Sequence, residues 1–526
     1  MTDQRRAPAL ARAWSPKASL AWPRPAAALW LIIAGFCALR LACAWLAGLG
    51  SDESYTVAVA RDLGLSYFDH PPVQYWLAHA MEPLAGVGRG DRAPFIALFA
   101  ASSWLMFRLT ARLFGEAAGL WATLALNLAP FFTVAAGGWV LPDGPLDCAL
   151  LAAAAVLAEI WFAEPDAALA RRPLAGWILA GLCLGLAGLS KYQAALTCLG
   201  LGLFLISTVQ GRRSLASPGP YLAAVIVLAV MSPVIVWNAQ HGWVSFAFQA
   251  GRGAPAHVKP LGPVIALAGQ LGLLAPWIFV PLAMAAVAAL RAGPAQARGW
   301  LCAMLALPAI VVFTLAPLSG APTLPHWSMP GWLMLFPLLG ERLAAAQTAG
   351  RAWPRRWALA SLAFVLVVGG AAASDAASGW AGHSLPRLFR HGDPTVESVE
   401  WTGLREPVAR ALPQLAPGAF IGALKWNEAG KVDQAAGDLA PVVALTDDAR
   451  QYRFRHPAAA YVGHDALIIG RLDLVKKRLP ALSPYFRSVG APISVSIGRD
   501  GDDEIVLGVV EARDLLRPFP QSKGSM

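Results

Sequence analysis

Long apolar runs alternate with short polar segments along the first 375 residues. The first run, residues 26–50, is too long for the apolar core of a typical signal peptide, so it predicts an uncleaved membrane span. Ten further runs have the length and composition of spans, at residues 92–113, 116–136, 146–163, 174–190, 192–209, 219–237, 262–290, 299–317, 328–345 and 357–374. The pattern predicts a polytopic α-helical membrane protein of about eleven spans. Residues 174–209 are also compatible with one span followed by a re-entrant segment.

The pattern changes over residues 376–526. Stretches typical of helices cover residues 396–412 and 472–482. Five short runs are typical of strands, at residues 420–426, 441–445, 466–470, 492–497 and 504–510. The last two runs flank the sequence GRDGDD at 498–503, which favours a hairpin turn. We therefore expect a small C-terminal α/β or α+β domain.

Charge gives the orientation of the spans. The chain is 57% hydrophobic and 14% charged, with a formal net charge of +10. The basic residues cluster between apolar runs, as at Arg171–Arg172 and Arg212–Arg213, so membrane topology explains them and nucleic-acid binding does not. The rule that short cytoplasmic loops are basic puts segment 1–25 in the cytoplasm of a bacterium. An odd number of spans across the inner membrane then places the tail in the periplasm.

This topology defines a membrane domain at 26–375 with periplasmic loops at 51–91, 137–145, 238–261 and 318–327. The first loop is long for a connector and begins with two adjacent carboxylates, Asp52 and Glu53. Asp143 stands in the second loop at the start of a predicted helix. All three acids also suit helix capping, so the residues alone leave both capping and chemistry open.

Two basic residues lie near or inside predicted spans. Lys191, followed by Tyr192, stands between two outward span ends, where snorkelling would explain it. Arg40 lies about ten residues below the outer end of the first span, where a charge is costly unless it has a partner or a wet cavity.

Metal ligands are a further possibility in the outer loops. Asp69 with His241, His257 and His326, and with His70 beside it, offers the atoms for a divalent metal ion, although no spacing is diagnostic. The six cysteines all fall inside apolar runs and are expected to be packing residues without disulfides or a CxxC site: Cys37, Cys43, Cys148, Cys183, Cys198 and Cys302.

The order of several short motifs resembles bacterial family 39 glycosyltransferases of the GT-C class. This class includes protein O-mannosyltransferases and the aminoarabinose transferases of lipid A. The motifs are the acid pair at 52–53, YFDHPP at 67–72, LPD at 141–143, GLSKY at 188–192 and WNAQHGW at 237–243, and KWNEAGK at 425–431 resembles the tails of some members. The resemblance covers about residues 26–345.

The resemblance implies transfer of a sugar from a polyprenyl phosphate to an acceptor hydroxyl. The expected acceptor is an envelope glycan or lipid such as lipopolysaccharide, and less readily a protein. The family's first-loop acid matches Asp52, the expected general base, and Asp143 would position acceptor or sugar. Lys191 and Arg252 are candidates for binding the donor phosphate, and Arg40 is a weaker candidate. Glu53, Asp69, His70 and Tyr192 complete the expected substrate-binding set.

One position departs from the aminoarabinose transferases, which carry a Lys where this chain has His70. A neutral imidazole supplies less charge at pH 7. The departure puts aminoarabinose in doubt and shifts phosphate binding toward Lys191, Arg252 or a metal.

Two other functions stay open from the sequence. A transporter or flippase of polyprenyl-linked precursors would need charged or broken helices at mid-membrane. A periplasmic binding module in the tail would need only one span as an anchor, so the prediction of about eleven spans argues against this function.

Overall fold

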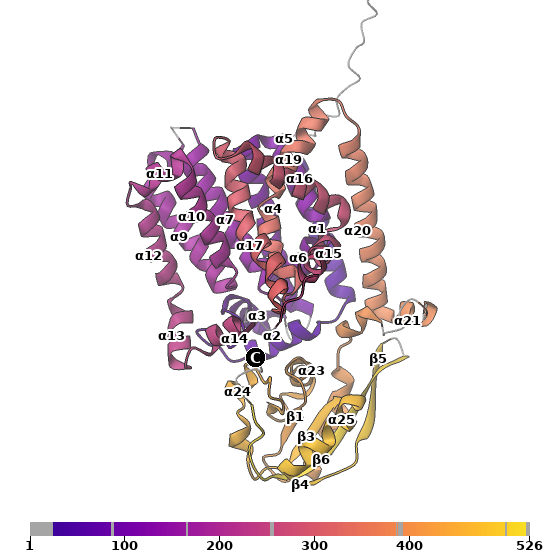
Figure 1. The fold of residues 1–526 in the computed structure, drawn as a ribbon. Coiled ribbons are helices and arrows are strands. Elements are labelled where there is room, and N and C mark those ends of the chain that lie inside the picture. The colour runs from indigo at the N-terminus through magenta and orange to yellow at the C-terminus, as the bar shows by residue number, and fades with distance from the viewer. Residues whose placement is uncertain are drawn as a thin grey trace, which may run out of the picture.

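The computed structural model describes residues 25–85, 89–164, 167–252, 257–385, 387, 393–499 and 502–521. The helical part occupies one end of the molecule and a sheet-containing C-terminal part the other (Figure 1). The expected cytoplasmic segment, apart from Pro25, lies outside the described residues.

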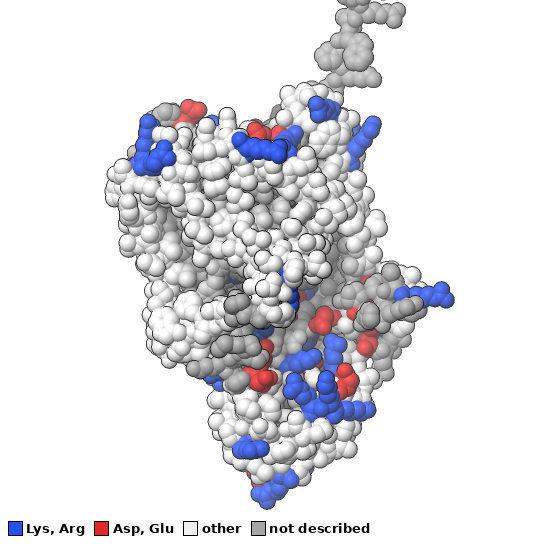
Figure 2. All heavy atoms as spheres, in the orientation of Figure 1, with Lys and Arg blue, Asp and Glu red and all other residues white. Residues whose placement is uncertain are grey.

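Within the described residues, six helices are long and apolar enough to cross a membrane. They are α1 (Pro25–Leu46), α4 (Ala93–Phe114), α7 (Asp143–Phe162), α9 (Pro173–Ser190), α17 (Ala297–Leu315) and α20 (Trp353–Ser378). Figure 2 shows a broad band of the helical part with almost no charged side chains. Charges gather at the end of the helical part that lies farthest from the C-terminal part, and around the C-terminal part itself. The expected multi-pass membrane protein is confirmed.

Four helix pairs reach span length only when taken together across a bend. They are α5 (Glu116–Leu128) with α6 (Pro130–Gly138) at 77°, α10 (Ala194–Ser207) with α11 (Val209–Leu215) at 100°, α12 (Gly219–Val230) with α13 (Ser232–Gln240) at 46°, and α15 (Gly262–Leu274) with α16 (Pro276–Ala292) at 114°. By length and composition alone, the described residues thus offer six spans, or up to ten if each bent pair counts as one, compared with the eleven expected. The region expected as a span at 328–345 forms two shorter helices, α18 (Met329–Leu333) and α19 (Phe336–Thr348).

Arg40 explains how one of these bends is held. Its guanidinium donates to the side chain of Asn127 at 2.9 Å and to the carbonyl of Thr133 at 3.0 Å, on either side of the α5–α6 break. It also lies over the ring of Phe99, 4.4 Å from the centroid. Because these acceptors and the aromatic face surround the buried guanidinium, they offset its desolvation. Arg40 is therefore a structural residue, and the expectation that it is a weaker phosphate ligand is wrong.

The C-terminal part contains a six-stranded mixed sheet in the order β2-β1-β3-β6-β4, with β5 also paired to β6. Its strands are β1 (Phe420–Ala423), β2 (Val442–Ala444), β3 (Ala466–Arg471), β4 (Phe486–Val489), β5 (Ile493–Arg499) and β6 (Asp502–Leu515). Strands β1, β2 and β3 are parallel, and the others run antiparallel to their neighbours.

All five predicted strands are present, and β5 and β6 pair as the predicted hairpin. Helix α25 (Leu472–Leu482) matches its prediction, whereas residues 396–412 form short turns and α22 (Arg405–Ala411). Strand β4 and helix α23 (Trp426–Ala436) were not predicted. The expected small α/β or α+β domain is confirmed.

The two parts share one hydrophobic core. Helix α2 (Ser51–Ala60), from the first loop, packs on α23, and α3 (Val73–Ala85) packs against α2. Tyr55 and Val57 of α2 belong to the same buried cluster as Val432 of α23 and Ile421 of β1. A Cβ at Gly430 would lie 2.5 Å from the backbone nitrogen of Tyr55, so only glycine lets the helices approach this closely.

Candidate functional site

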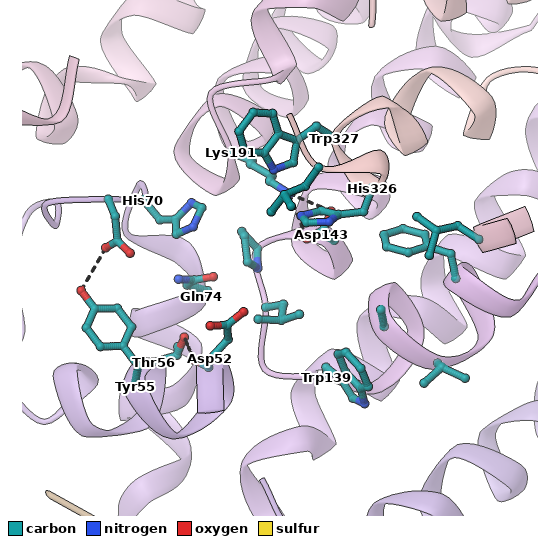
Figure 3. A pocket seen from close by; sticks show the side chains of 18 of the residues that line it. Asp52, Tyr55, Thr56, His70, Gln74, Trp139, Asp143, Lys191, His326 and Trp327 are labelled. Carbon is teal, nitrogen blue, oxygen red and sulfur yellow. Dashed lines mark hydrogen bonds and ion pairs between the residues drawn. The ribbon is translucent and has the colours of Figure 1, made fainter. Parts of the chain in front are cut away.

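A cavity of about 590 Å³ lies where the helical part meets the C-terminal part. Its walls come from the first loop, the start of α7, the segment after α9, the loops before α18, and the C-terminal part. Figure 3 shows the carboxylates of Asp52 and Asp143 directed into the same space from different elements. The cavity brings together most of the expected site residues: Asp52, Asp69, His70, Asp143, Lys191, Arg252 and His326.

Asp52 lies in the first turn of α2 with its side chain open to the cavity. The capping box of this helix uses Glu53, whose carboxylate accepts from the Gly50 backbone N–H at 2.8 Å. Among the described residues no hydrogen bond or ion pair engages the carboxylate of Asp52. Desolvation by the surrounding protein raises the pKa of Asp52, and the positive charge of Arg450 partly opposes that rise.

Glu53 does not line the cavity. Both its oxygens accept from the guanidinium of Arg92, at 2.8 and 2.6 Å, and one also accepts from the backbone N–H of Val140 at 3.0 Å. The carboxylate joins the first loop to the second loop and to the start of α4, and it is buried. The expectation that Glu53 binds substrate is wrong because the protein itself uses all of its acceptor capacity.

Replacing Glu53 with Gln should lower stability and leave the cavity lining unchanged. The substitution leaves the buried Arg92 cation without its counter-ion, which typically costs about 3–5 kcal/mol. Thermal unfolding of the purified protein in detergent measures the effect, with the exposed Glu406→Gln variant as the control. An unfolding midpoint equal to that of wild type would contradict this structural role.

Asp143 and Lys191 form a buried ion pair in the cavity wall. The Lys191 ammonium donates to the two carboxylate oxygens of Asp143 at 2.8 and 3.0 Å (Figure 3). Asp143 begins α7, and Lys191 directly follows the last residue of α9. The pair joins the ends of two packed helices, α7 and α9. Lys191 is 3% exposed, so its ammonium does not extend to solvent as a snorkelling lysine would.

Asp69 and His70 stand on the opposite side of the cavity. The carboxylate of Asp69 accepts from the hydroxyls of Tyr55 and Tyr75 and from Arg450, each at 3.1 Å. Burial opposes its ionisation, but His70, Arg450 and Tyr55 outweigh burial and hold the pKa of Asp69 below its usual value. Asp69 therefore organises the first loop.

Burial lowers the pKa of His70 to about 4, so its imidazole is neutral at pH 7. The neighbouring cations Lys191, Arg450 and Arg252 contribute to the lowering, against the attraction of Asp69. The buried Nδ1 atom of His70 has no hydrogen-bond partner in the structure. His70 can thus exchange a hydrogen bond with a ligand, but it does not add a positive charge.

Arg252 ends α14 (Val244–Arg252) and reaches the cavity between two aromatic rings. Its guanidinium carbon lies 4.8 Å from the ring centroid of Phe248 and 5.0 Å from that of Trp327. In the part of the chain that the structure describes, no carboxylate lies within ion-pair distance of Arg252. Its charge is held by aromatic faces and stays free to meet an anion.

The expected metal site is not assembled. No group of three or more His, Cys, Asp or Glu side chains suited to a metal ion occurs within the described ranges. His241 stacks on Trp237 with ring centroids 4.0 Å apart, and His257 is exposed. His326 reaches the cavity and stacks near Phe131, but Asp69 is engaged by the first loop and by Arg450. The four candidates contact separate neighbours, so among the described residues they do not form a common metal site.

Tyr192 also lies outside the cavity lining. Its ring packs beside Phe246 at 5.5 Å between centroids, in an apolar cluster with Leu189 and Val234. The ring packs in this cluster beside the helix end and does not line the cavity, so the structure gives no support for Tyr192 as a substrate ligand.

Two cavity residues, Trp426 and Arg450, come from the C-terminal part and were not predicted. Trp426 follows strand β1 and Arg450 follows strand β2, which are parallel neighbours. Since the carboxyl ends of parallel strands meet at one edge of a sheet, the loops that follow β1 and β2 lie together. Both strands were predicted from the sequence, and parallel pairing between them is the signal that could have located these two residues.

Comparison with known proteins agrees with this fold. Residues 69–237 match the family described as dolichyl-phosphate-mannose-protein mannosyltransferase, a segment that contains Asp69, His70, Asp143 and Lys191. No curated protein sequence matches the chain at a significant level.

Solved structures match over most of the chain. ArnT from Cupriavidus metallidurans, bound to undecaprenyl phosphate, is 17% identical with a TM-score of 0.63, and the match covers 91% of this chain and 97% of that one. The oligosaccharyltransferase of Archaeoglobus fulgidus in complex with Zn and sulfate is 11% identical with a TM-score of 0.52, covering 88% and 72%. The chain therefore shares its fold with these two proteins, and the predicted resemblance to the family is confirmed over residues 69–237.

Proposed function

We propose that this protein is a membrane glycosyltransferase that moves a sugar from a polyprenyl phosphate to an acceptor hydroxyl. The observation that carries the proposal is the single cavity that holds an unpaired carboxylate, Asp52, together with a cation free of any carboxylate in the described residues, Arg252. The first suits proton removal from a hydroxyl and the second suits a phosphate. A transporter finds no support in the comparisons, since the solved structures that share this fold are ArnT and an oligosaccharyltransferase.

The residues divide the reaction between two sides of the cavity. On the first-loop side, Asp52 accepts the proton of the acceptor hydroxyl as that oxygen bonds to the sugar's anomeric carbon. The bond from that carbon to the phosphate oxygen breaks, and the polyprenyl phosphate leaves with the electron pair. On the other side, Arg252 and the remaining N–H of Lys191 stabilise the charge on the departing phosphate. Asp143 fixes the position of Lys191.

Arg252→Ala should weaken donor binding. A charge-assisted hydrogen bond contributes about 1.5–3 kcal/mol, which corresponds to a roughly 10- to 100-fold higher KM for the lipid-linked donor. Steady-state transfer in detergent measures the KM, with Arg487→Ala, an exposed arginine of the sheet, as the matched control. An unchanged donor KM would remove Arg252 from the phosphate site.

The C-terminal part, which supplies Trp426 and Arg450 to the cavity, lies at one end of the helical bundle (Figure 1). We place this end in the periplasm of a bacterium, with the N-terminus in the cytoplasm and the helices in the inner membrane, because the positive-inside rule applied to the loops gives that orientation. An envelope glycan or lipid such as lipopolysaccharide is the acceptor that this face can reach.

The test is a transfer assay in membranes with radiolabelled polyprenyl-phosphate sugars and envelope extracts as acceptors. Wild-type protein should label a glycan or lipid fraction, and vesicles without the protein should not. Movement of the labelled lipid across the bilayer without transfer of its sugar would support the transporter alternative and overturn the proposal.

A further inference from the structure

The C-terminal part reaches the cavity through Trp426, at the start of α23, and through a short segment after β2. Arg450 projects from this segment, and its guanidinium donates to the carboxylate of Asp69 at 3.1 Å. Its guanidinium carbon lies 3.4 Å from the ring centroid of Trp426. The side chain is 14% exposed and lines the cavity. A planar cation held both by a carboxylate and by an aromatic face is fixed in direction.

The backbone around Arg450 is fixed by the first loop. Arg450 has φ of 45°, a left-handed conformation that is costly for a side chain of this size. The next residue, Gln451, accepts from the backbone N–H of Phe68 at 2.8 Å and donates its own N–H to the hydroxyl of Tyr55 at 3.2 Å. Arg455 donates to the carbonyl of Ala58 at 3.0 Å. These contacts hold the strained position in place.

Asp52 lines the same cavity as Arg450 and Asp69. The charged groups that act most strongly on its carboxylate are Arg450, which favours ionisation, and Asp69, Glu397 and Glu53, which oppose it. Arg252, another cation of the lining, also interacts with Asp52. Glu53 is neutralised by Arg92, and Glu397 lies within 3.4 Å of Arg471. Arg450 is therefore the main arginine that balances the first loop's two cavity-lining carboxylates, with a smaller contribution from Arg252.

We propose that Arg450 is a positioning residue of the transfer site: it holds Asp69 in place and supplies the positive charge that faces Asp52. The C-terminal domain is then one wall of the reaction cavity and not an accessory module. This inference rests on the proposed function, because that function makes Asp52 the general base of the transfer.

The charge effect can be measured without any transfer activity. Carbodiimide with an added amine labels carboxyl groups in their protonated form, and mass spectrometry of the full-length protein gives the pH midpoint of labelling at Asp52. Arg450→Gln should move that midpoint up by about one pH unit, because a nearby cation no longer favours the carboxylate. Arg450→Lys keeps the charge, so its midpoint should stay near that of wild type.

Arg513→Gln is the matched control, because it removes an arginine–carboxylate contact of the C-terminal domain, with Asp465 at 3.0 Å, away from the cavity. It should leave the labelling midpoint of Asp52 unchanged. In the transfer assay, Arg450→Gln should shift the acidic limb of kcat/KM upward by the same amount.

The outcomes separate the two proposals. An Asp52 midpoint that is the same in wild type and Arg450→Gln would overturn the role of Arg450, whatever the activity. A shift of the midpoint by Arg513→Gln as well would also overturn it, because the effect would then be general to the domain. A shifted midpoint in Arg450→Gln alone, with no transfer by wild type, would count against the proposed function and would support the coupling.

Discussion

Asp52→Asn is expected to reduce transfer by about 10²- to 10⁴-fold, the range for loss of a general base. Asparagine has nearly the same shape as aspartate, so the cavity and α2 should be retained. Glu53, which forms the capping box and contacts Arg92, is untouched. The lost rate should appear mainly in kcat, because the proton moves only as the acceptor bond forms.

The matched control is Asp473→Asn, which changes an exposed acid in the first turn of α25. It makes the same chemical change at a helix N-terminus outside the cavity and should keep full activity. Both variants are compared with wild type in steady-state transfer and in thermal unfolding. Full activity of a folded Asp52→Asn protein would remove Asp52 from the chemistry.

The pH dependence of wild-type transfer follows from the environment of Asp52. Desolvation raises the pKa of this carboxyl, and only the ionised form accepts a proton. As the pH falls through the raised pKa, kcat/KM should decline, at a pH above the ordinary value of about 4 for aspartate. The acidic limb should be absent from the residual activity of Asp52→Asn.

Lys191→Met should cause the second large effect, on stability and transfer together. The substitution leaves the Asp143 carboxylate buried without its counter-ion, which typically costs about 3–5 kcal/mol. It also removes the N–H that we assign to the donor phosphate. Thermal unfolding and transfer are measured side by side, with Lys476→Met, an exposed lysine of α25, as the control.

A double variant separates the two consequences. Asp143→Asn combined with Lys191→Met removes both charges, so no unpaired ion remains in the wall and most of the stability should return. Transfer should stay low, because the cation is still missing. Recovery of transfer along with stability would limit the pair to a structural role.

The sequence predicted the spans that stand as single helices better than the bent ones. A run of apolar residues specifies burial in a membrane, whether the helix inside it is straight or broken. Each bent pair was predicted as one run, and the bend inside it was not predicted. At the α5–α6 break, polar groups on both sides are bound by Arg40, from another helix. A single run cannot show that partner, so the sequence took Arg40 for a candidate ligand.

Among the polar residues, the sequence by itself determined which types were available and at which end of the helices they gather. The residues alone left helix capping open for the acids and snorkelling open for Lys191. Together with the family resemblance, the sequence was enough to select Asp52, Asp143, Lys191 and Arg252, because charged residues beside apolar runs need a polar cavity or a partner.

Only the tertiary structure decided which of these groups are still free to act. Glu53 is adjacent to Asp52 in sequence, yet Arg92 and the Val140 backbone N–H consume its acceptors, while the carboxylate of Asp52 faces the cavity. Arg450 joins the site from a part of the chain hundreds of residues away, because α2 and α23 share one core. Hydrogen-bond capacity is used up by neighbours in space, and spacing along the chain does not record those neighbours.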